Sequence, residues 1–308
     1  MSYLYVEHCI VDQAGKAVEL LNKEGRVMVP VASLSLLMLG PGTSVTHAAV
    51  RVLAENGCLA IWCGEEGVRF YAQGMGETRK GYHLMKQAEL SSDPEKRYEV
   101  VKRMYRYRFK DDLDAGLSLE QVRGLEGVRV RQAYADASRQ YGVPWHGRFY
   151  DRQRWQAGDP INRALSTASA CLNGICHAGI VSGGYSPGLG FIHSGRQLSF
   201  VYDIADLYKT EITIPLAFRL VAESEQDLET RVRRACRDAF REARLLQRIL
   251  PDIDHLLGVE ADEEGPLEDV DEDLGLPGPL WTDSARVVDG GKNYGRDGAG
   301  GGTPFPAG

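Results

Sequence analysis

The chain has 308 residues, of which 36 are Lys or Arg and 43 are Asp or Glu, so its formal net charge is −7. This length is sufficient for one large or two ordinary domains with a buried core. No stretch approaches the roughly 20 apolar residues of a membrane span, and the first residues lack a basic segment followed by an apolar one. Six cysteines in a chain of this length do not make a disulfide framework. These features indicate a soluble cytoplasmic protein and argue against a secreted or membrane protein.

The acidic excess is confined to the end of the chain. Residues 251–308 contain 14 acidic and three basic residues, so residues 1–250 contain 33 basic and 29 acidic residues, a net charge of +4. The tail combines an acidic run with Pro and Gly, a composition that buries too little apolar surface to fold. We expect residues 260–308 to be disordered. The negative total therefore does not exclude a nucleic-acid partner.

Short β-rich segments separated by turn residues fill residues 3–74. One helical pattern interrupts them at residues 47–56, where Thr46 is suited to the N-cap and Gly57 to the position after the helix. We predict an antiparallel β domain with one small helix, spanning residues 1–76.

The remaining ordered part of the chain has helical periodicity. Helices are predicted within residues 92–109, 118–142, 161–181, 198–209 and 230–250. The predicted fold class is α+β: an N-terminal antiparallel β domain, a larger all-α domain over residues 77–259, and a disordered tail.

Two common nucleotide-binding motifs are absent. The sequence contains no GxxxxGK[ST] and no GxGxxG at a strand–helix junction. Two cysteine pairs have members five residues apart, a spacing that places them on opposite faces of a strand or about 140° apart on a helix. Zinc is therefore not expected, and the thiols are interpreted as small buried hydrophobic groups. The pairs are Cys58 with Cys63 and Cys171 with Cys176.

Glu126 is a candidate functional carboxylate. It shares one face of a predicted helix with Val122, Val130, Ala133 and Ala137. A carboxylate on an apolar face must be paired or coordinated, because its desolvation is unfavourable. An ordinary ion pair with Arg123 or Arg129 is the alternative to a functional role.

A second group of candidates surrounds the start of the helix predicted over residues 198–209. His193 lies in a turn flanked by glycines, and Asp203 and Asp206 are three residues apart, so they share a helix face. Carboxylates together with an imidazole suit Mg²⁺ or Mn²⁺. A structural histidine is the alternative.

Basic residues recur at helical spacing in the last predicted helix. They are Arg234, Arg237, Arg241, Arg244 and Arg248, predicted to form one continuous stripe. A solvated surface is the ordinary interpretation, and a surface that tracks phosphates is the alternative. Aromatic and basic residues are interleaved in residues 69–163. This combination suits splayed DNA ends, because bases can stack on the aromatic rings while the cations hold the phosphates. Together with the carboxylates and His193, this pattern indicates metal-dependent chemistry on a phosphodiester.

Four motifs resemble a known family. They are GPGTSVTHAAVR (40–51), RGLEGVRVRQAYADASRQYGVPWHGRFYD (123–151), GFIHSGRQLSFVYDIADLYK (190–209) and RVRRACRD (231–238). The sequence is similar to the CRISPR-associated integrases, and most similar to the branch found with Cascade-type (type I-E) systems. The resemblance covers about residues 3–255 and implies an N-terminal β domain followed by a helical domain.

The resemblance also implies partners and site residues. It implies a homodimer, two of which flank a dimer of the small second CRISPR-associated protein in a heterohexameric complex. That complex captures double-stranded DNA with 3′-OH ends and inserts it into CRISPR repeat DNA. The implied metal ligands are Glu126, His193 and Asp206, with Asp203 in support. The implied DNA-binding positions are Arg51, Arg69, Tyr150, Trp155, Arg196, Tyr202, Lys209 and Arg233. A tyrosine that opens the DNA fork in one relative aligns nearest Glu7, so that role is not assigned.

The implied reaction is direct transesterification by a DNA 3′-OH, which needs no protein nucleophile and requires Mg²⁺ or Mn²⁺. Two other functions remain open on the residues alone. One is a metal-dependent repair nuclease acting on branched DNA, and the other is a DNA-binding scaffold without catalytic activity.

Overall fold

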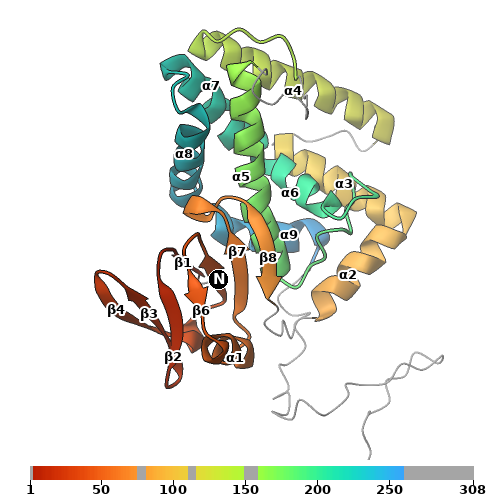
Figure 1. Ribbon diagram of the computed structural model, residues 1–308. Helices are drawn as coiled ribbons and strands as arrows, with labels where there is room; N and C mark the ends of the chain where they lie inside the picture. Colours follow the sequence, from red (N-terminus) through yellow and green to blue (C-terminus); the bar gives the residue numbers. More distant parts are fainter. Residues whose placement is uncertain (1–2, 75–80, 110–115, 149–158, 260–308) are drawn as a thin grey trace, which may run out of the picture. The chain divides into compact units, whose positions relative to one another are not determined.

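The computed structural model describes residues 3–74, 81–109, 116–148 and 159–259, which belong to one compact unit (Figure 1). The predicted disordered tail and the predicted domain boundary near residue 76 both lie outside the described residues. Within them, a strand-rich region is followed by a helical region, which confirms the α+β fold class.

Two four-stranded sheets form the N-terminal region. The first has the order β1 (Tyr3–Val6), β5 (Leu36–Leu39), β7 (Leu59–Cys63) and β8 (Phe70–Gly74). The second has the order β4 (Gly25–Pro30), β3 (Ala17–Asn22), β2 (Ile10–Ala14) and β6 (Ser44–Val45). Two short 3₁₀ turns lie at Val31–Ser33 and Glu65–Gly67.

These sheets are mixed, which corrects the prediction of an antiparallel domain. The pairs β1–β5, β5–β7 and β2–β6 are parallel, whereas β2–β3, β3–β4 and β7–β8 are antiparallel. Parallel neighbours require a crossover connection, and helix α1 (His47–Glu55) lies in the one between β5 and β7. Turn residues in the sequence indicate hairpins between consecutive strands, but they do not indicate which distant strands pair in parallel.

The predicted ends of α1 are confirmed. The Thr46 hydroxyl accepts a hydrogen bond from the Ala49 amide, and Gly57 follows the helix at φ 66°. Buried side chains of α1 pack on those of the strands to form the core of this region, which includes Val11, Val18, Leu37 and Leu53.

Eight α-helices follow within the described residues. They are α2 (Gly81–Ser92), α3 (Pro94–Phe109), α4 (Leu119–Tyr141), α5 (Pro160–Ser182), α6 (Ser199–Tyr208), α7 (Ile214–Glu223), α8 (Leu228–Glu242) and α9 (Leu245–Leu257). A π-helical turn, Lys209–Thr213, joins α6 to α7. The predicted ends of α4, at residues 118 and 142, are confirmed, since Ser118 forms a capping box with Gln121 and Gly142 ends α4 at φ 67°.

The sequence predicted that the arginine stripe lies on one continuous helix, and this prediction is wrong. Arg244 adopts φ 48° between α8 and α9, so the two helices are separate. Leu245 and Leu246, the first residues of α9, are buried. The break therefore places Arg248 on a different helix from Arg234 and Arg237.

Helix α5 runs through the middle of the helical region, with α6, α7, α8 and α9 packed around it (Figure 1). Among the described residues, α5 is the helix whose length and composition would allow it to cross a membrane. Of its most apolar 18-residue stretch, 67% is buried in the protein. This corrects the expectation that no stretch approaches a membrane span. Because its neighbours cover it, α5 is the buried core helix of this region. All six cysteines are free and buried, which confirms the prediction of buried thiols for the two cysteine pairs.

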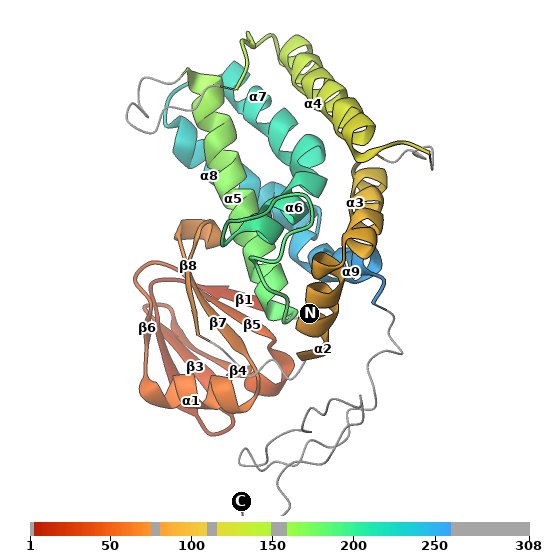
Figure 2. The same ribbon diagram turned by 90° about the vertical axis from the view of Figure 1, so that its right-hand side faces the viewer.

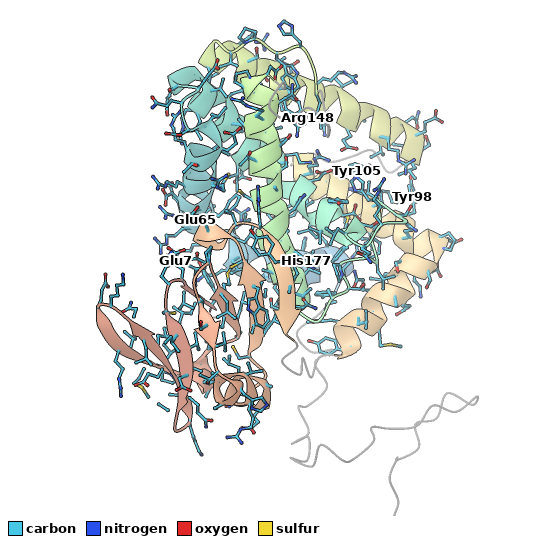
Figure 3. All side chains as sticks on the ribbon, viewed as in Figure 1. Glu7, Glu65, Tyr98, Tyr105, Arg148 and His177 are labelled. Carbon is cyan, nitrogen blue, oxygen red and sulfur yellow. The ribbon has the colours of Figure 1, made fainter. Side chains whose placement is uncertain are left out.

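His177 on α5 stacks on Phe70 of β8, with ring centroids 3.7 Å apart (Figure 3). Burial lowers the pKa of His177 to about 4. The folded protein therefore disfavours the imidazolium, and stability that is complete above pH 6.5 is lost as the pH falls towards 4. We expect this residue alone to account for about 2–3 kcal/mol of that loss. Urea unfolding of wild type and His177→Phe between pH 7 and 4 checks this, and equal pH dependence in both would contradict it.

Candidate active site

The candidate residues come from two helices and one loop. Helix α6 lies between α5 and α3 in both views (Figure 2), and it carries Asp203 and Asp206. His193 lies in the loop before α6, and Glu126 lies on α4. The structure therefore brings the four candidates from distant parts of the sequence into one region.

Asp203 organises the loop that carries His193. Its side chain is fully buried and accepts hydrogen bonds from the backbone amides of Phe191 (2.6 Å), Ile192 (3.1 Å) and His193 (2.9 Å). Its Oδ1 also lies 2.7 Å from His193 Nδ1. Four donors thus surround one carboxylate, which explains how a buried charge is tolerated.

The Asp203 contact also orients His193. The hydrogen bond to Asp203 is the main cause that raises the pKa of His193. Because Nδ1 faces Asp203, Nε2 is the ring nitrogen left for a metal ion or substrate. The His193 side chain is 45% exposed, and its ring meets that of Tyr202 edge-on at a centroid distance of 5.9 Å.

Glu126 and Asp206 share one cation, Arg108 of α3. Arg108 Nη1 forms an ion pair with Glu126 Oε1 and lies 3.7 Å from Asp206 Oδ2. Lys209 Nζ pairs with the other oxygen of Asp206. The sequence prediction considered Arg123 or Arg129 as the partner of Glu126, whereas the structure pairs it with a residue on another helix.

The sequence analysis did not predict Arg108 as a site residue, although its position on the helix indicated a buried side chain. On α3 it continues the spacing of the buried residues Val101, Met104 and Tyr105. An arginine on an otherwise apolar helix face indicates a buried anionic partner, in the same way that Glu126 did on its own helix.

Two further residues hold the His193 loop and were also missed. Gln87 of α2 is fully buried and bonds to the amide of Ser186 (2.8 Å) and to the carbonyls of Ser186 and Leu189 (both 3.0 Å). Arg97 Nε of α3 donates to the Phe191 carbonyl at 2.9 Å. Neither residue has a sequence signal, because each contacts the backbone of a segment about 100 residues away.

The predicted DNA-binding residues fall into separate groups. Arg69 and Arg233 line one open hollow of about 440 Å³ together with His8 and Tyr71. Arg51 lies on α1, where it bonds to Gln13. Arg196 lies in the His193 loop, Tyr202 on α6, and Lys209 directly after α6. Tyr150 and Trp155 lie outside the described residues.

The donor set matches a hard divalent cation in its chemistry. Glu126 and Asp206 offer carboxylate oxygens, and His193 offers a nitrogen, the combination expected for Mg²⁺ or Mn²⁺. The two carboxylates already converge on a positive charge, the Arg108 guanidinium. As placed, no three His, Cys, Asp or Glu side chains of the described segments converge closely enough to hold an ion together.

The fold is an α+β fold of the kind seen in the crystal structure of a TtCas1–DNA complex. That chain is 56% identical, the TM-score is 0.79, and the match covers 84% of this chain and 97% of the other. The family model for CRISPR associated protein Cas1 matches residues 3–112 and 108–237, and the chain belongs to this family. The resemblance expected from the four motifs is thus confirmed.

Curated relatives support the same assignment. CRISPR-associated endonuclease Cas1 2 of Thermus thermophilus is 55% identical over 311 residues, covering 100% of this chain and 94% of the relative. CRISPR-associated endonuclease Cas1 of Escherichia coli is 41% identical over 282 residues, covering 91% and 92%. Both relatives bear the name of an endonuclease, which supports a nuclease role in CRISPR adaptation for the family.

Proposed function

We propose that this protein is a metal-dependent DNA endonuclease and integrase of CRISPR adaptation that acts in the cytoplasm. The observation that carries the proposal is the Asp203-held His193 just before α6, the helix whose Asp206 shares the Arg108 cation with Glu126, in a chain whose relatives are named endonucleases. In the reaction, the 3′-OH of incoming DNA attacks a phosphodiester of the CRISPR repeat. A new P–O bond forms as the attacking hydroxyl loses its proton, the P–O bond to the 3′-oxygen of the cut strand breaks, and that leaving oxygen takes up a proton.

Glu126, His193 and Asp206 are the residues that would hold the ion. A bound Mg²⁺ or Mn²⁺ would supply Lewis-acid stabilisation of the charge that develops on the phosphodiester oxygens. Asp203 holds Nδ1 of the His193 ring, which leaves Nε2 as the nitrogen for the ion. Arg196 and Lys209, beside the loop and α6, supply positive charge for the DNA phosphates.

DNA capture is assigned to the basic residues away from this centre. Arg69 and Arg233 share one hollow, and Arg51 is exposed on α1, so both places can contact phosphates. Tyr150 and Trp155 are proposed as aromatic contacts in the same function. The similarity to the TtCas1 chain of a protein–DNA complex supports double-stranded DNA as a ligand. The proposed assembly is a homodimer, two of which flank a dimer of the small second CRISPR-associated protein in a heterohexamer.

The test uses a short duplex with free 3′-OH ends, a supercoiled plasmid carrying a CRISPR array, the second CRISPR-associated protein, and Mn²⁺ or Mg²⁺. We expect integration by the wild type and a loss of at least about 100-fold in Glu126→Ala and His193→Ala, because each removes a proposed ion ligand. Glu120→Ala, an exposed position on the same helix as Glu126, is the matched control and should integrate normally.

The outcomes separate the proposal from its rivals. Integration that survives both site variants would overturn the assigned site. Products that are only nicked, even with the second protein present, would favour a branched-DNA repair nuclease. A protein that binds the duplex but gives no product would be a scaffold.

A further inference from the structure

Arg108 occupies an unusual place for a charged residue. Its side chain is only 5% exposed, although it lies at the end of α3 next to the proposed metal site. Glu126 and Asp206, its two partners, are 22% and 17% exposed. One guanidinium therefore joins the two carboxylates proposed as ion ligands, one from α4 and one from α6.

The positive charge of Arg108 compensates the two negative charges of Glu126 and Asp206. Two carboxylates held near each other away from water repel, and a cation between them relieves that repulsion. A guanidinium can do so with donor nitrogens in a fixed plane. A divalent ion would compensate the same two charges through the same carboxylates, so the two cations compete for one position.

We propose that Arg108 is a resident counter-cation that must withdraw from Glu126 and Asp206 when a divalent ion binds, and that it thereby sets the metal affinity of the site. This inference rests on the proposed function, because it takes Glu126 and Asp206 as ion ligands. It explains why both carboxylates converge on one charge while no three ligand side chains of the described segments converge on an ion position.

Lys209 does not have the same role. Its ammonium pairs with Asp206, and its side chain is 29% exposed. A flexible, partly exposed lysine can turn towards solvent without leaving a buried charge unpaired. Arg108 is more deeply buried and is paired with both carboxylates, so its displacement is the step that limits metal affinity.

A second partner is available to Glu126 when Arg108 moves. Tyr105, one turn earlier on α3 (Figure 3), is 1% exposed, and its hydroxyl is near enough to the Glu126 carboxylate to interact with it. Burial and the nearby charge of Glu126 raise the pKa of Tyr105 to about 12. A neutral phenol this close to the carboxylate can donate to it, which would hold Glu126 in place without the guanidinium.

The direct test is a titration of metal-free protein with Mn²⁺ alone, without DNA, followed by the electron paramagnetic resonance signal of free Mn²⁺. We expect Arg108→Gln to bind Mn²⁺ about tenfold more tightly than the wild type, because a competing charge has been removed. Arg106→Gln, which removes the same charge from the same helix, is the matched control and should bind like the wild type. An unchanged or weaker affinity in Arg108→Gln would overturn the proposal.

Thermal unfolding gives a second readout. Without metal, Arg108→Gln should unfold at a lower temperature than the wild type, because its two carboxylates lose their cation. Mn²⁺ should raise its Tm by more than that of the wild type, since tighter binding to the folded state gives more stabilisation. A purely structural role would lower Tm equally with and without Mn²⁺, and that result would contradict the proposal.

Arg108→Lys keeps the test valid if the glutamine variant does not fold. An ammonium preserves the charge but cannot present donors to both carboxylates in one plane. We expect Mn²⁺ affinity between those of the wild type and Arg108→Gln. Affinity equal to or below the wild type in the folded lysine variant would overturn the proposal.

Failure of the proposed function has a different signature. If Glu126→Gln and His193→Ala bind Mn²⁺ as tightly as the wild type, the assigned metal site is wrong whatever Arg108 does. If both variants lose Mn²⁺ binding while Arg108→Gln leaves it unchanged, the metal site stands and only the role of Arg108 is rejected.

Discussion

Replacing Asp203 with alanine is expected to lower the free energy of unfolding by about 3–5 kcal/mol, and to reduce integration at least about 100-fold. The physical reason is the number of donors that depend on this carboxylate. The amides of Phe191, Ile192 and His193 and the Nδ1 atom of His193 all bond to it. Without Asp203, buried donors lose their acceptor and the His193 ring loses its orientation.

Urea unfolding and the integration assay measure the two effects on the same protein. Asp238→Ala is the control for stability, because Asp238 lies on the surface of α8 with a side chain 61% exposed. That variant should unfold within about 0.5 kcal/mol of the wild type. An Asp203→Ala protein with wild-type stability and wild-type integration would show that the loop does not depend on this carboxylate.

Asp203 also illustrates what sequence can provide about a site. Asp203 and Asp206 share a helix face because of their spacing, and His193 lies shortly before the same helix. Residues this close in sequence are constrained by local geometry alone. Their grouping was therefore predictable, and so was the assignment of Glu126 as a carboxylate needing a cation.

The identity of that cation was not predictable in the same way. Arg108 reaches Glu126 across the contact between α3 and α4, and its distance from Asp206 depends on how α3 packs on α6. Helical periodicity fixes which face of α3 is buried, but it does not say which helix covers that face. The cation could be located only once the packing of three helices was known.

The fold shows the same difference between features set by neighbouring residues, which were predictable, and features set by distant contacts, which were not. Helix ends at Thr46, Ser118 and Gly142 follow from hydrogen bonds or backbone angles within a few residues, and all were predicted. The parallel strand pairs join segments about 20 or more residues apart, and turn residues carry no information about them. The break at Arg244 was missed because the residues on either side have uninterrupted helical periodicity, which a single left-handed residue does not disturb.

The loop that carries His193 should also be intolerant of a single methyl group at Gly190. A Cβ atom there would lie 2.4 Å from the carbonyl oxygen of His193, 2.8 Å from the Cβ of Ser199 and 2.9 Å from its carbonyl carbon. Two of these three atoms belong to backbone, so no side-chain rotation relieves the overlap. The loop must open, and opening it moves His193 away from Asp203.

We therefore expect Gly190→Ala to lower the free energy of unfolding by about 1–3 kcal/mol, and to reduce integration at least about 100-fold because the His193 ring is displaced. Gly188→Ala is a matched control two residues away, since its Cβ would meet the Gln197 carbonyl oxygen at an ordinary 3.5 Å. That control should unfold and integrate like the wild type. Equal activity in the two variants would mean that the loop can shift without moving His193, and that its hydrogen bonds to Asp203 are not what sets the geometry of the site.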